Sequence, residues 1–332
     1  MDIFYPDYYP RFRCIADACP DSCCHGWAVT VDEDSARYYR TLPGELGDIL
    51  RSHLIEEDGE TILSLTADGR CPMWAQDGLC RLQCEHGEQA LCQVCKEFPR
   101  LRHDYGSFAE LGLELSCPEA AKLILSAENQ AFLCKSVAGG DEPDYDTDAM
   151  TILLRSREQV LDFLTEQTLS VGEALAVVLL YGYAVQSELD GGDRAVLSPE
   201  DMLKTARSLA RAGSAAEVLE FYRDLEILTP QWSAMLAAPK GSAWREAHRA
   251  MARYMIARYW LQAVSDYDLI GRAKLTVLSC LVVKLLGGNI LRTAQLYSKE
   301  IENDADNIDA ILDGAYTSPA LADIRLLELL LQ

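Results

Sequence analysis

Residues 19–32, "CPDSCCHGWAVTVD", carry three cysteines within six positions, and two of them, Cys23 and Cys24, are adjacent. Cysteines that fill an apolar core as small hydrophobic residues are seldom clustered in this way. We therefore interpret the stretch as part of a site in which thiolates hold a metal. Because neighbouring side chains diverge, we expect one of the adjacent cysteines to be a ligand, while the other serves a second site or packing.

The cysteines around this stretch extend the pattern. Cys14 and Cys19 precede the adjacent pair, and a second group of cysteines follows some fifty residues later. The second group contains a C-x2-C pair, in which a tight turn lets two thiolates converge on one ion. We predict nine ligands in all: Cys14, Cys19, Cys23, Cys24, Cys71, Cys80, Cys92, Cys95 and Cys117.

Three further cysteines are interpreted differently. Cys84 lies in the polar stretch "CRLQCEHGEQ", where a ligand and an incidental cysteine are equally good interpretations. Cys134 and Cys280 lie in apolar segments that we expect to be helical, so we predict that both are buried small hydrophobic residues.

The metal itself is left open between zinc and iron–sulfur. Zinc takes four-coordinate sites of cysteine and histidine, whereas iron–sulfur clusters take cysteine almost exclusively. His25, His86 and His103 do not form an H-x3–5-H pair. Nine cysteines without paired histidines favour an iron–sulfur centre over zinc.

The overall composition excludes two classes of partner. The chain of 332 residues has a net charge of −22, and acidic residues are in excess both before and after residue 135. Nucleic-acid binders and proteins of anionic membrane surfaces carry basic patches instead, so we predict neither partner. The first residues lack a secretory signal, and no apolar run reaches the ~18 residues of a membrane span. We therefore expect a cytoplasmic protein with reduced thiols.

Cysteine content also divides the chain. Eleven of the twelve cysteines precede residue 136, and a polar loop, "SVAGGDEPDYDTD", occupies residues 136–148. We predict a cysteine-rich, metal- or iron–sulfur-binding domain over 1–140 and an α-helical domain over 141–332. The fold class is thus mainly α, with a metal-stapled N-terminal domain followed by a helical bundle.

Hydrophobic periodicity places the helices of the second part. We predict helices within 149–167, 170–189, 198–213, 243–264 and 271–286, the second with a capping box from Ser170 and Glu173. In the first part, we expect an extended piece before a helix that Asp32 caps, and short helices over 87–98 and 117–127. Cys117 directly precedes Pro118 and so lies at a helix start, where backbone N–H groups favour a thiolate.

Three segments of the first part resemble the flagellin lysine-N-methylase family. They are "FRCIADACPDSCCHGWAVTVD" (12–32), "CPMWAQDGLCRLQCEHGEQALCQVCKEFPR" (71–100) and "AELGLELSCPEAAKLIL" (109–125). The family pattern places cysteines at all nine predicted ligand positions, in the same order, but not at Cys84. The helical segment 254–286 is similar to the remainder of that family, although this part is less specific.

The resemblance implies an activity: methyl transfer from S-adenosylmethionine to lysine side chains of flagellin, with a [4Fe–4S] cluster as cofactor. Two common signatures for binding the methyl donor are absent from the sequence. Cys19-x3-Cys23 is followed at once by Cys24, so there is no C-x3-C-x2-C triplet, and no strand–GxGxxG–helix motif occurs. The resemblance therefore does not say which residues hold the donor.

Polar residues near the cysteines are candidates for the methyl-transfer chemistry. A lysine amine must lose its proton before it attacks a methyl group, and Glu110, Glu114 and Tyr105 are candidate bases. Arg100 follows the C-x2-C pair and is a candidate for binding the carboxylate of the cofactor. For each of these residues, a structural or solvated role is the simpler interpretation.

A non-catalytic function is the alternative hypothesis. A cysteine-cluster domain that stores, senses or folds around zinc or iron, joined to a partner-binding helical domain, would show the same spacing. A redox role for Cys92 and Cys95 is a weaker alternative, because the chain lacks the βαβ context of thioredoxin-like proteins.

Overall fold

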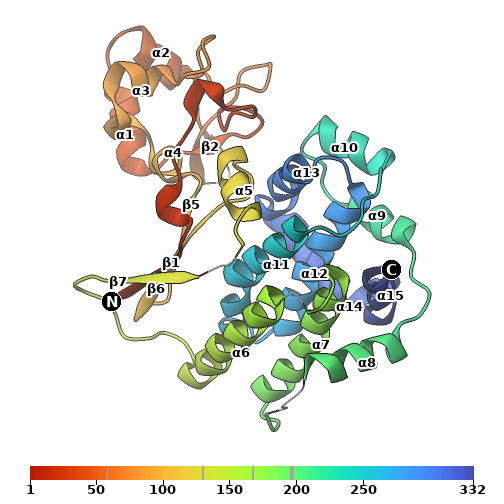
Figure 1. Cartoon of the computed structure of the whole chain (residues 1–332). Helices are drawn as coiled ribbons and strands as arrows, with labels where there is room; N and C mark the ends of the chain where they lie inside the picture. The colour runs from red at the N-terminus through yellow and green to blue at the C-terminus, as the bar shows by residue number, and fades with distance from the viewer. Residues whose placement is uncertain (58, 129–130, 167, 195–197) are drawn as a thin grey trace. The chain divides into compact units, whose positions relative to one another are not determined.

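The computed structural model describes residues 1–57, 59–128, 131–166, 168–194 and 198–332. Within these ranges the chain forms two compact units (Figure 1). The cysteine unit comprises Phe12–Leu101 and Cys117–Ala120, and the helical unit comprises Met1–Arg11, Arg102–Ser116 and Ala121–Gln332. This division differs from the expected boundary between residues 140 and 141, because strands from both sides of the cysteine unit pair with each other.

A four-stranded sheet in the helical unit explains the division. Its strand order is β5-β6-β1-β7, where β1 is Asp2–Pro6, β5 is Arg100–Asp104, β6 is Phe108–Leu113 and β7 is Phe132–Ser136. β1 runs parallel to β6, with Asp2 opposite Phe108, and antiparallel to β7, with Asp2 opposite Ser136. The cysteine unit is therefore an insertion between β1 and the strands that follow it. The sequence analysis did not predict this sheet.

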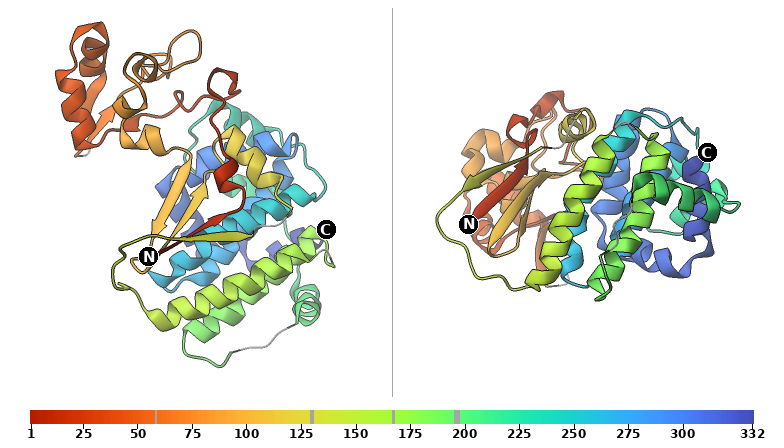
Figure 2. Two further views of the ribbon diagram at one scale, coloured as in Figure 1. Left: turned by 60° about the vertical axis from the view of Figure 1, so that its left-hand side comes forward. Right: turned by 60° about the horizontal axis from the view of Figure 1, so that its bottom comes forward.

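Helices make up the rest of the helical unit, as predicted. They are α6 (Thr147–Thr165), α7 (Val171–Leu189), α8 (Pro199–Leu209), α9 (Ala215–Arg223), α10 (Pro230–Ala237), α11 (Glu246–Tyr259), α12 (Leu269–Leu286), α13 (Ile290–Tyr297), α14 (Ala305–Thr317) and α15 (Asp323–Leu331). A π-helical segment, Ser298–Glu302, continues α13. α6 and α7 lie side by side (Figure 2).

The core of the helical unit centres on α7 and α12. Most residues of both helices are buried, and Gly182 lets them approach closely, since a Cβ there would lie 2.7 Å from the Cβ of Ala273. Local signals fixed the helix starts. The predicted capping box of Ser170 and Glu173 is confirmed, and the Ser198 side chain caps α8 by accepting from the Asp201 N–H.

The cysteine unit is built of short elements. It contains α1 (Glu33–Thr41), α2 (Gly44–His53), α3 (Arg81–His86), α4 (Gln93–Glu97) and the start of α5 (Pro118–Leu125), together with a sheet of order β2-β4-β3 formed by Val29–Thr30, Glu60–Leu63 and Leu54–Glu57. As predicted, Asp32 caps the first helix, with its carboxylate accepting from the Ser35 N–H. The second carboxylate oxygen accepts from the Gln93 N–H at the start of α4 and so ties α4 to α1.

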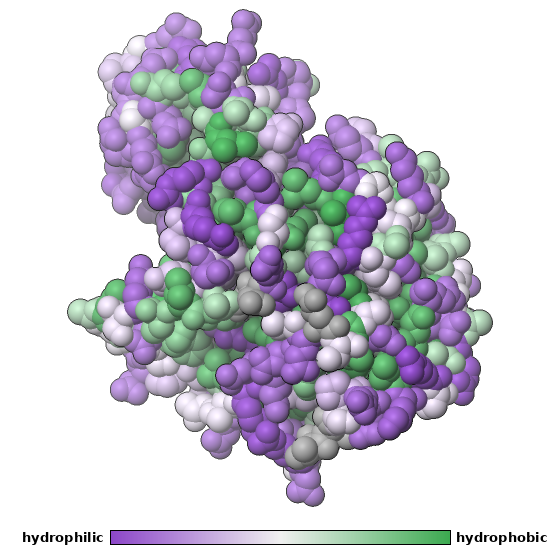
Figure 3. Space-filling model, viewed as in Figure 1, coloured by the Kyte–Doolittle hydropathy of each residue, from purple (hydrophilic) through white to green (hydrophobic). Residues whose placement is uncertain are grey.

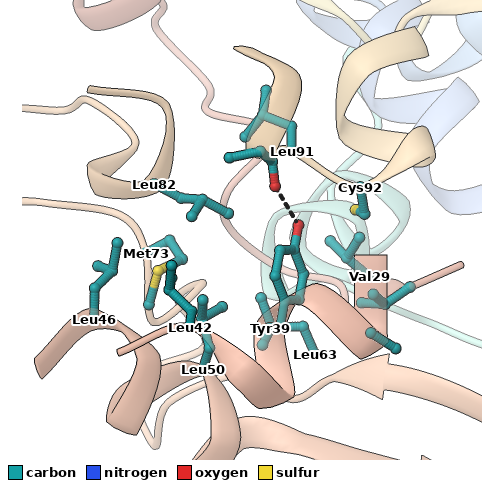
Figure 4. Close-up of a cluster of buried hydrophobic side chains, with 13 residues drawn as sticks. Val29, Tyr39, Leu42, Leu46, Leu50, Leu63, Met73, Leu82, Leu91 and Cys92 are labelled. Atoms are coloured by element: carbon teal, nitrogen blue, oxygen red, sulfur yellow. Dashed lines mark hydrogen bonds between the residues drawn. The ribbon is translucent and has the colours of Figure 1, made fainter. Parts of the chain in front are cut away.

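A small hydrophobic core supports the cysteine unit (Figure 4). Leu50 and Tyr39 are buried at its centre, and the Tyr39 hydroxyl donates to the Ala90 carbonyl at 3.0 Å. Cys92 belongs to this core, while Cys71 and Cys80 pack against it. The core therefore fixes the backbone that carries three of the predicted ligands.

The surface is rich in polar residues. Hydrophilic side chains cover much of the face drawn in Figure 3, in keeping with the net charge of −22. No helix among the described residues is both long and apolar enough to cross a membrane.

Candidate metal centre and catalytic residues

All nine predicted ligands lie in the cysteine unit. This holds even for Cys117, because the four residues Cys117–Ala120 pack with the cysteine unit while the chain on either side belongs to the helical unit. All twelve cysteines lie among the described residues, and none of them forms a disulfide bond. The three cysteine-bearing segments of the sequence are thus brought into one compact unit.

Four thiols form what we call the first sulfur group: Cys24, Cys71, Cys92 and Cys95. Cys24 and Cys71 hydrogen bond through their sulfurs, and their backbones meet where the Cys71 N–H donates to the Cys24 carbonyl at 2.8 Å. Cys92 and Cys95 hydrogen bond through their sulfurs as well. The two pairs are neighbours, since negative charge on Cys71 and Cys24 acts on Cys95.

Hydrogen bonding within these pairs makes one thiol of each more acidic. The hydrogen bond from Cys95 lowers the pKa of Cys92, and the bond from Cys24 lowers the pKa of Cys71. The bond to Cys92 raises the pKa of Cys95. At Cys24 a hydrogen bond from Cys23 lowers the pKa, but the bond to Cys71, burial and the neighbouring thiolates together outweigh it and raise the pKa. The thiolate is the form in which cysteine binds a metal.

The remaining ligand candidates gather separately. Charges on Cys19 and Cys23 act on Cys117, and charges on Cys23 and Cys14 act on Cys19, so we call these four the second sulfur group. Cys80 is influenced by Cys23 and itself acts on Cys24, which places it beside both groups. The adjacent Cys23 and Cys24 therefore face different sets of neighbours, although their thiols also hydrogen bond to each other.

Cys117 has the predicted helix-start position. Backbone N–H groups of Glu119 and Ala120, in the first turn of α5, point at its sulfur and lower its pKa, but burial outweighs them and raises the pKa to about 11. Among the described residues, no three Cys, His, Asp or Glu side chains are already arranged to hold a metal ion. The nine sulfurs therefore match a thiolate-bound centre in the type of donor atom only.

The cysteines outside the predicted set are only partly as expected. Cys280 is fully buried on α12, as predicted. The prediction for Cys134 is wrong: it lies on β7, not on a helix, and is exposed. The apolar run around it fits the short strand, which pairs with β1 on the edge of the sheet, where a side chain can face solvent. Cys84 is exposed on α3.

The candidate catalytic residues have different surroundings. Glu110 is buried and receives two hydrogen bonds, of 2.6 and 2.7 Å, from the guanidinium of Arg157. Tyr105 stacks on Phe108 at 4.8 Å, and burial raises its pKa. Both groups are held in structural contacts that do not favour proton transfer. Arg100 is exposed, with its guanidinium 5.1 Å from the ring centre of Phe12.

Glu114 differs from these. It follows β6 directly and is only partly buried, and its carboxylate accepts from the Ser116 hydroxyl at 2.9 Å. Burial raises the pKa of Glu114, while Arg258 opposes that rise. Arg258 and Glu302, which lie beside Glu114, are more than 140 residues away in sequence. No sequence pattern indicates a functional role for either residue, because both lie in helical segments whose sequence is typical of a buried core.

Comparison with known proteins supports the resemblance drawn from the cysteine segments. The chain is 35% identical over 128 residues to a lysine-N-methylase of Salmonella typhimurium, covering 36% of this chain and 32% of that protein. It is 34% identical over the same length to the flagellar biosynthetic protein FliU of Salmonella muenchen, 75% of which is covered. No protein-family model and no solved structure matches the chain.

These matches place the chain among the relatives of FliU and of proteins named lysine-N-methylase. It belongs to the family of FliU and the lysine-N-methylases, which confirms the family predicted from the sequence. The matched region spans about a third of the length of the two Salmonella lysine-N-methylases.

Proposed function

We propose that this chain methylates lysine side chains of a protein substrate, flagellin by family likeness, with S-adenosylmethionine as the methyl donor. The observation that carries the proposal is the match to proteins named lysine-N-methylase and FliU. The gathering of nine free cysteines in one unit supports it. Free thiols fit a reducing compartment, and we propose that the protein acts in the cytoplasm.

We further propose that the cysteine unit holds a [4Fe–4S] cluster. The first sulfur group, Cys24, Cys71, Cys92 and Cys95, supplies the most closely connected set of ligands. The second sulfur group is available for a further centre or for packing. When bound, a cluster supplies cross-links between short elements and an electron-transfer centre.

The chain's own residues must convert the ammonium group of the substrate lysine into a neutral amine. In a polar transfer, the lysine nitrogen uses its lone pair to form a bond to the methyl carbon, and the carbon–sulfur bond breaks with its electron pair staying on the donor sulfur. The amine must first give a proton to a base. Of the three candidates, Glu114 fits this role best, because it is partly exposed and its raised pKa makes it a better proton acceptor.

The direct test is methylation of a purified flagellin by the anaerobically purified chain. With S-adenosylmethionine present, mass spectrometry should show added masses of one or more methyl groups on flagellin lysines. Metal analysis and electron paramagnetic resonance on the same sample should show iron and a cluster signal. Unmodified lysines with an iron-loaded protein would refute the proposed activity.

A non-catalytic metal module is the second candidate. It is favoured by the limited match, since 32% of the lysine-N-methylase is covered and the rest of that protein has no counterpart in the alignment. A colourless protein with stoichiometric zinc and no methyl transfer would support this alternative. A brown protein that absorbs near the ~400 nm band of iron–sulfur clusters would contradict it.

A further inference from the structure

A buried polar cluster lies in the helical unit, apart from the cysteines. At its centre is Glu302, whose carboxylate accepts from the hydroxyl of Tyr254 at 3.1 and 3.2 Å and from that of Tyr259 at 3.0 Å. The guanidinium of Arg258 lies 3.3 Å from the same carboxylate and donates to the Tyr254 hydroxyl at 2.6 Å. The Glu302 side chain is fully buried.

Two helical segments fix the geometry of this cluster. Tyr254 and Arg258 are four residues apart on α11, so their side chains lie on the same face of the helix. Glu302 is the last residue of the π-helical segment Ser298–Glu302. Such segments are rare and are frequently found at functional sites. Since every carboxylate oxygen of Glu302 is hydrogen bonded, the cluster is a rigid support.

Glu114 forms the outer part of the cluster. It interacts electrostatically with both Arg258 and Glu302, and its side chain hydrogen bonds to Asn303, the residue after the π-helical segment. The next backbone N–H, that of Leu115, donates to the Tyr254 hydroxyl at 3.4 Å. Glu114 is only partly buried, whereas Glu302 is not accessible. Glu114 is therefore partly open to solvent, whereas the Glu302 side chain is not.

The charges of the cluster do not balance. The carboxylates of Glu114 and Glu302 face the single guanidinium of Arg258. His103 lies nearby, but burial and Arg258 lower its pKa, so it adds no positive charge at neutral pH. The Nε2 atom of His103 is buried without a hydrogen-bond partner among the described residues. Glu110, the other carboxylate near His103, is already paired with Arg157.

We propose that Glu114 binds an alkylammonium group, namely the side chain of the acceptor lysine. Arg258, Glu302, Tyr254 and Tyr259 are its positioning residues. The inference rests on the proposed function and names the residue that receives its substrate amine. A single positive charge complements the one uncompensated carboxylate. A divalent cation fits less well, because it would give the cluster a net positive charge and is repelled by the Arg258 guanidinium about twice as strongly as a single charge at the same distance.

Binding of a small lysine probe tests the inference without requiring methyl transfer. Saturation-transfer NMR on the full chain would compare N-acetyl-lysine-N-methylamide with the norleucine analogue, which lacks the ammonium group. The wild-type protein should bind the lysine probe and prefer it to the norleucine probe by about 10-fold or more, the value of a charge-assisted hydrogen bond. Equal binding of the two probes would overturn the inference.

Two glutamine variants locate the effect. Glu114→Gln should remove the preference for the lysine probe, whereas Glu158→Gln, the same change at an exposed position on α6, should retain it. Circular dichroism checks that both variants fold. A preference that survives in Glu114→Gln refutes the assignment.

Tyr259→Phe tests the support. It removes one hydrogen bond to Glu302, 3.0 Å long, and should weaken lysine-probe binding while leaving the norleucine probe unaffected. An unchanged preference in this variant would remove Tyr259 from the support. If the lysine probe binds through Glu114 but flagellin is never methylated, the proposed function fails while the binding site stands.

Discussion

Replacing Glu110 with glutamine should destabilise the helical unit strongly, for a reason visible in its contacts. Both side chains of the Glu110–Arg157 pair are less than one-tenth exposed, and the guanidinium donates to both carboxylate oxygens. Glutamine preserves the shape of the side chain but leaves the charge of Arg157 buried without a counter-ion. Removing one partner of such a pair leaves a desolvated charge, which is more costly than losing the interaction itself.

The expected size of the effect follows from this burial. Breaking a buried ion pair from one side costs about 3–5 kcal/mol. In a unit of this size, a loss of that order lowers the unfolding midpoint by roughly 10 °C. Arg157→Met should cost a similar amount, and the double variant should cost less than the sum, because no unpaired charge is then buried.

Thermal unfolding, followed by the circular dichroism signal of the helices, measures these differences in stability. Glu158→Gln is the matched control, since it makes the same chemical change at an exposed position of α6 and should shift the midpoint by no more than about 1–2 °C. A loss below about 1 kcal/mol in Glu110→Gln, or strict additivity in the double variant, would refute the reasoning. A stable Glu110→Gln protein that has lost methyl transfer would instead identify Glu110 as the base.

Three further outcomes are expected. Replacing both Cys92 and Cys95 with alanine should abolish bound metal in anaerobic metal analysis, while Cys280→Ala, a buried cysteine far from the sulfur groups in sequence, should leave the metal content unchanged. Leu50→Ala removes a fully buried side chain from the core of the cysteine unit and should cost about 2–5 kcal/mol, seen as lost amide-exchange protection in α2. The Ser170 backbone N–H lowers the pKa of Glu173, so the stability that this carboxylate contributes is present above its ordinary pKa of ~4.3 and is lost as the pH falls through the lowered value. Glu173→Ala should therefore lower the free energy of unfolding by about 1 kcal/mol at pH 7, with a smaller difference between the melting curves below about pH 4.

Local signals allowed much of the fold to be predicted. Asp32, Ser170 and Ser198 mark helix starts because a short polar side chain satisfies backbone N–H groups that only a helix start leaves free. The sheet could not be predicted in the same way. β1 pairs with residues more than 100 positions away, and nothing within five residues of Asp2 indicates its partner Phe108.

The candidate sites, too, could be predicted only where the signal is local in the sequence. Cysteine spacing indicates candidate ligands because chelation requires several donors of one type close together in sequence. The nine candidates could therefore be named from the sequence, and the structure places all nine in one unit. The grouping of Cys24 with Cys71, and of Cys23 with Cys117, depends on how distant segments fold together. The same is true of Glu302 and Arg258, which are ordinary helix residues until Glu114 is placed beside them.

The position of the cysteine unit in the chain leads to a last expectation about metal removal. The unit begins and ends next to strands of the helical unit's sheet, so the chain from Phe12 to Leu101 serves as the connection between β1 and its parallel partner β6. Parallel pairing needs a long connection in any case, and the entropy of closing a loop rises only slowly with its length, by about 0.6 kcal/mol for each doubling. The sheet can thus form whether or not the insertion is ordered. The cysteine unit, by contrast, has only a small core, and under the proposed function it depends in addition on bonds from its cysteines to the metal.

Chelating the metal should therefore open the cysteine unit to proteases while the helical unit stays intact. Limited proteolysis with mass spectrometry would show new cuts within residues 12–101 and protected fragments covering α6 to α15. If both units became equally susceptible to proteolysis after chelation, the metal would stabilise the whole chain. The four-stranded sheet would then depend on an ordered cysteine unit.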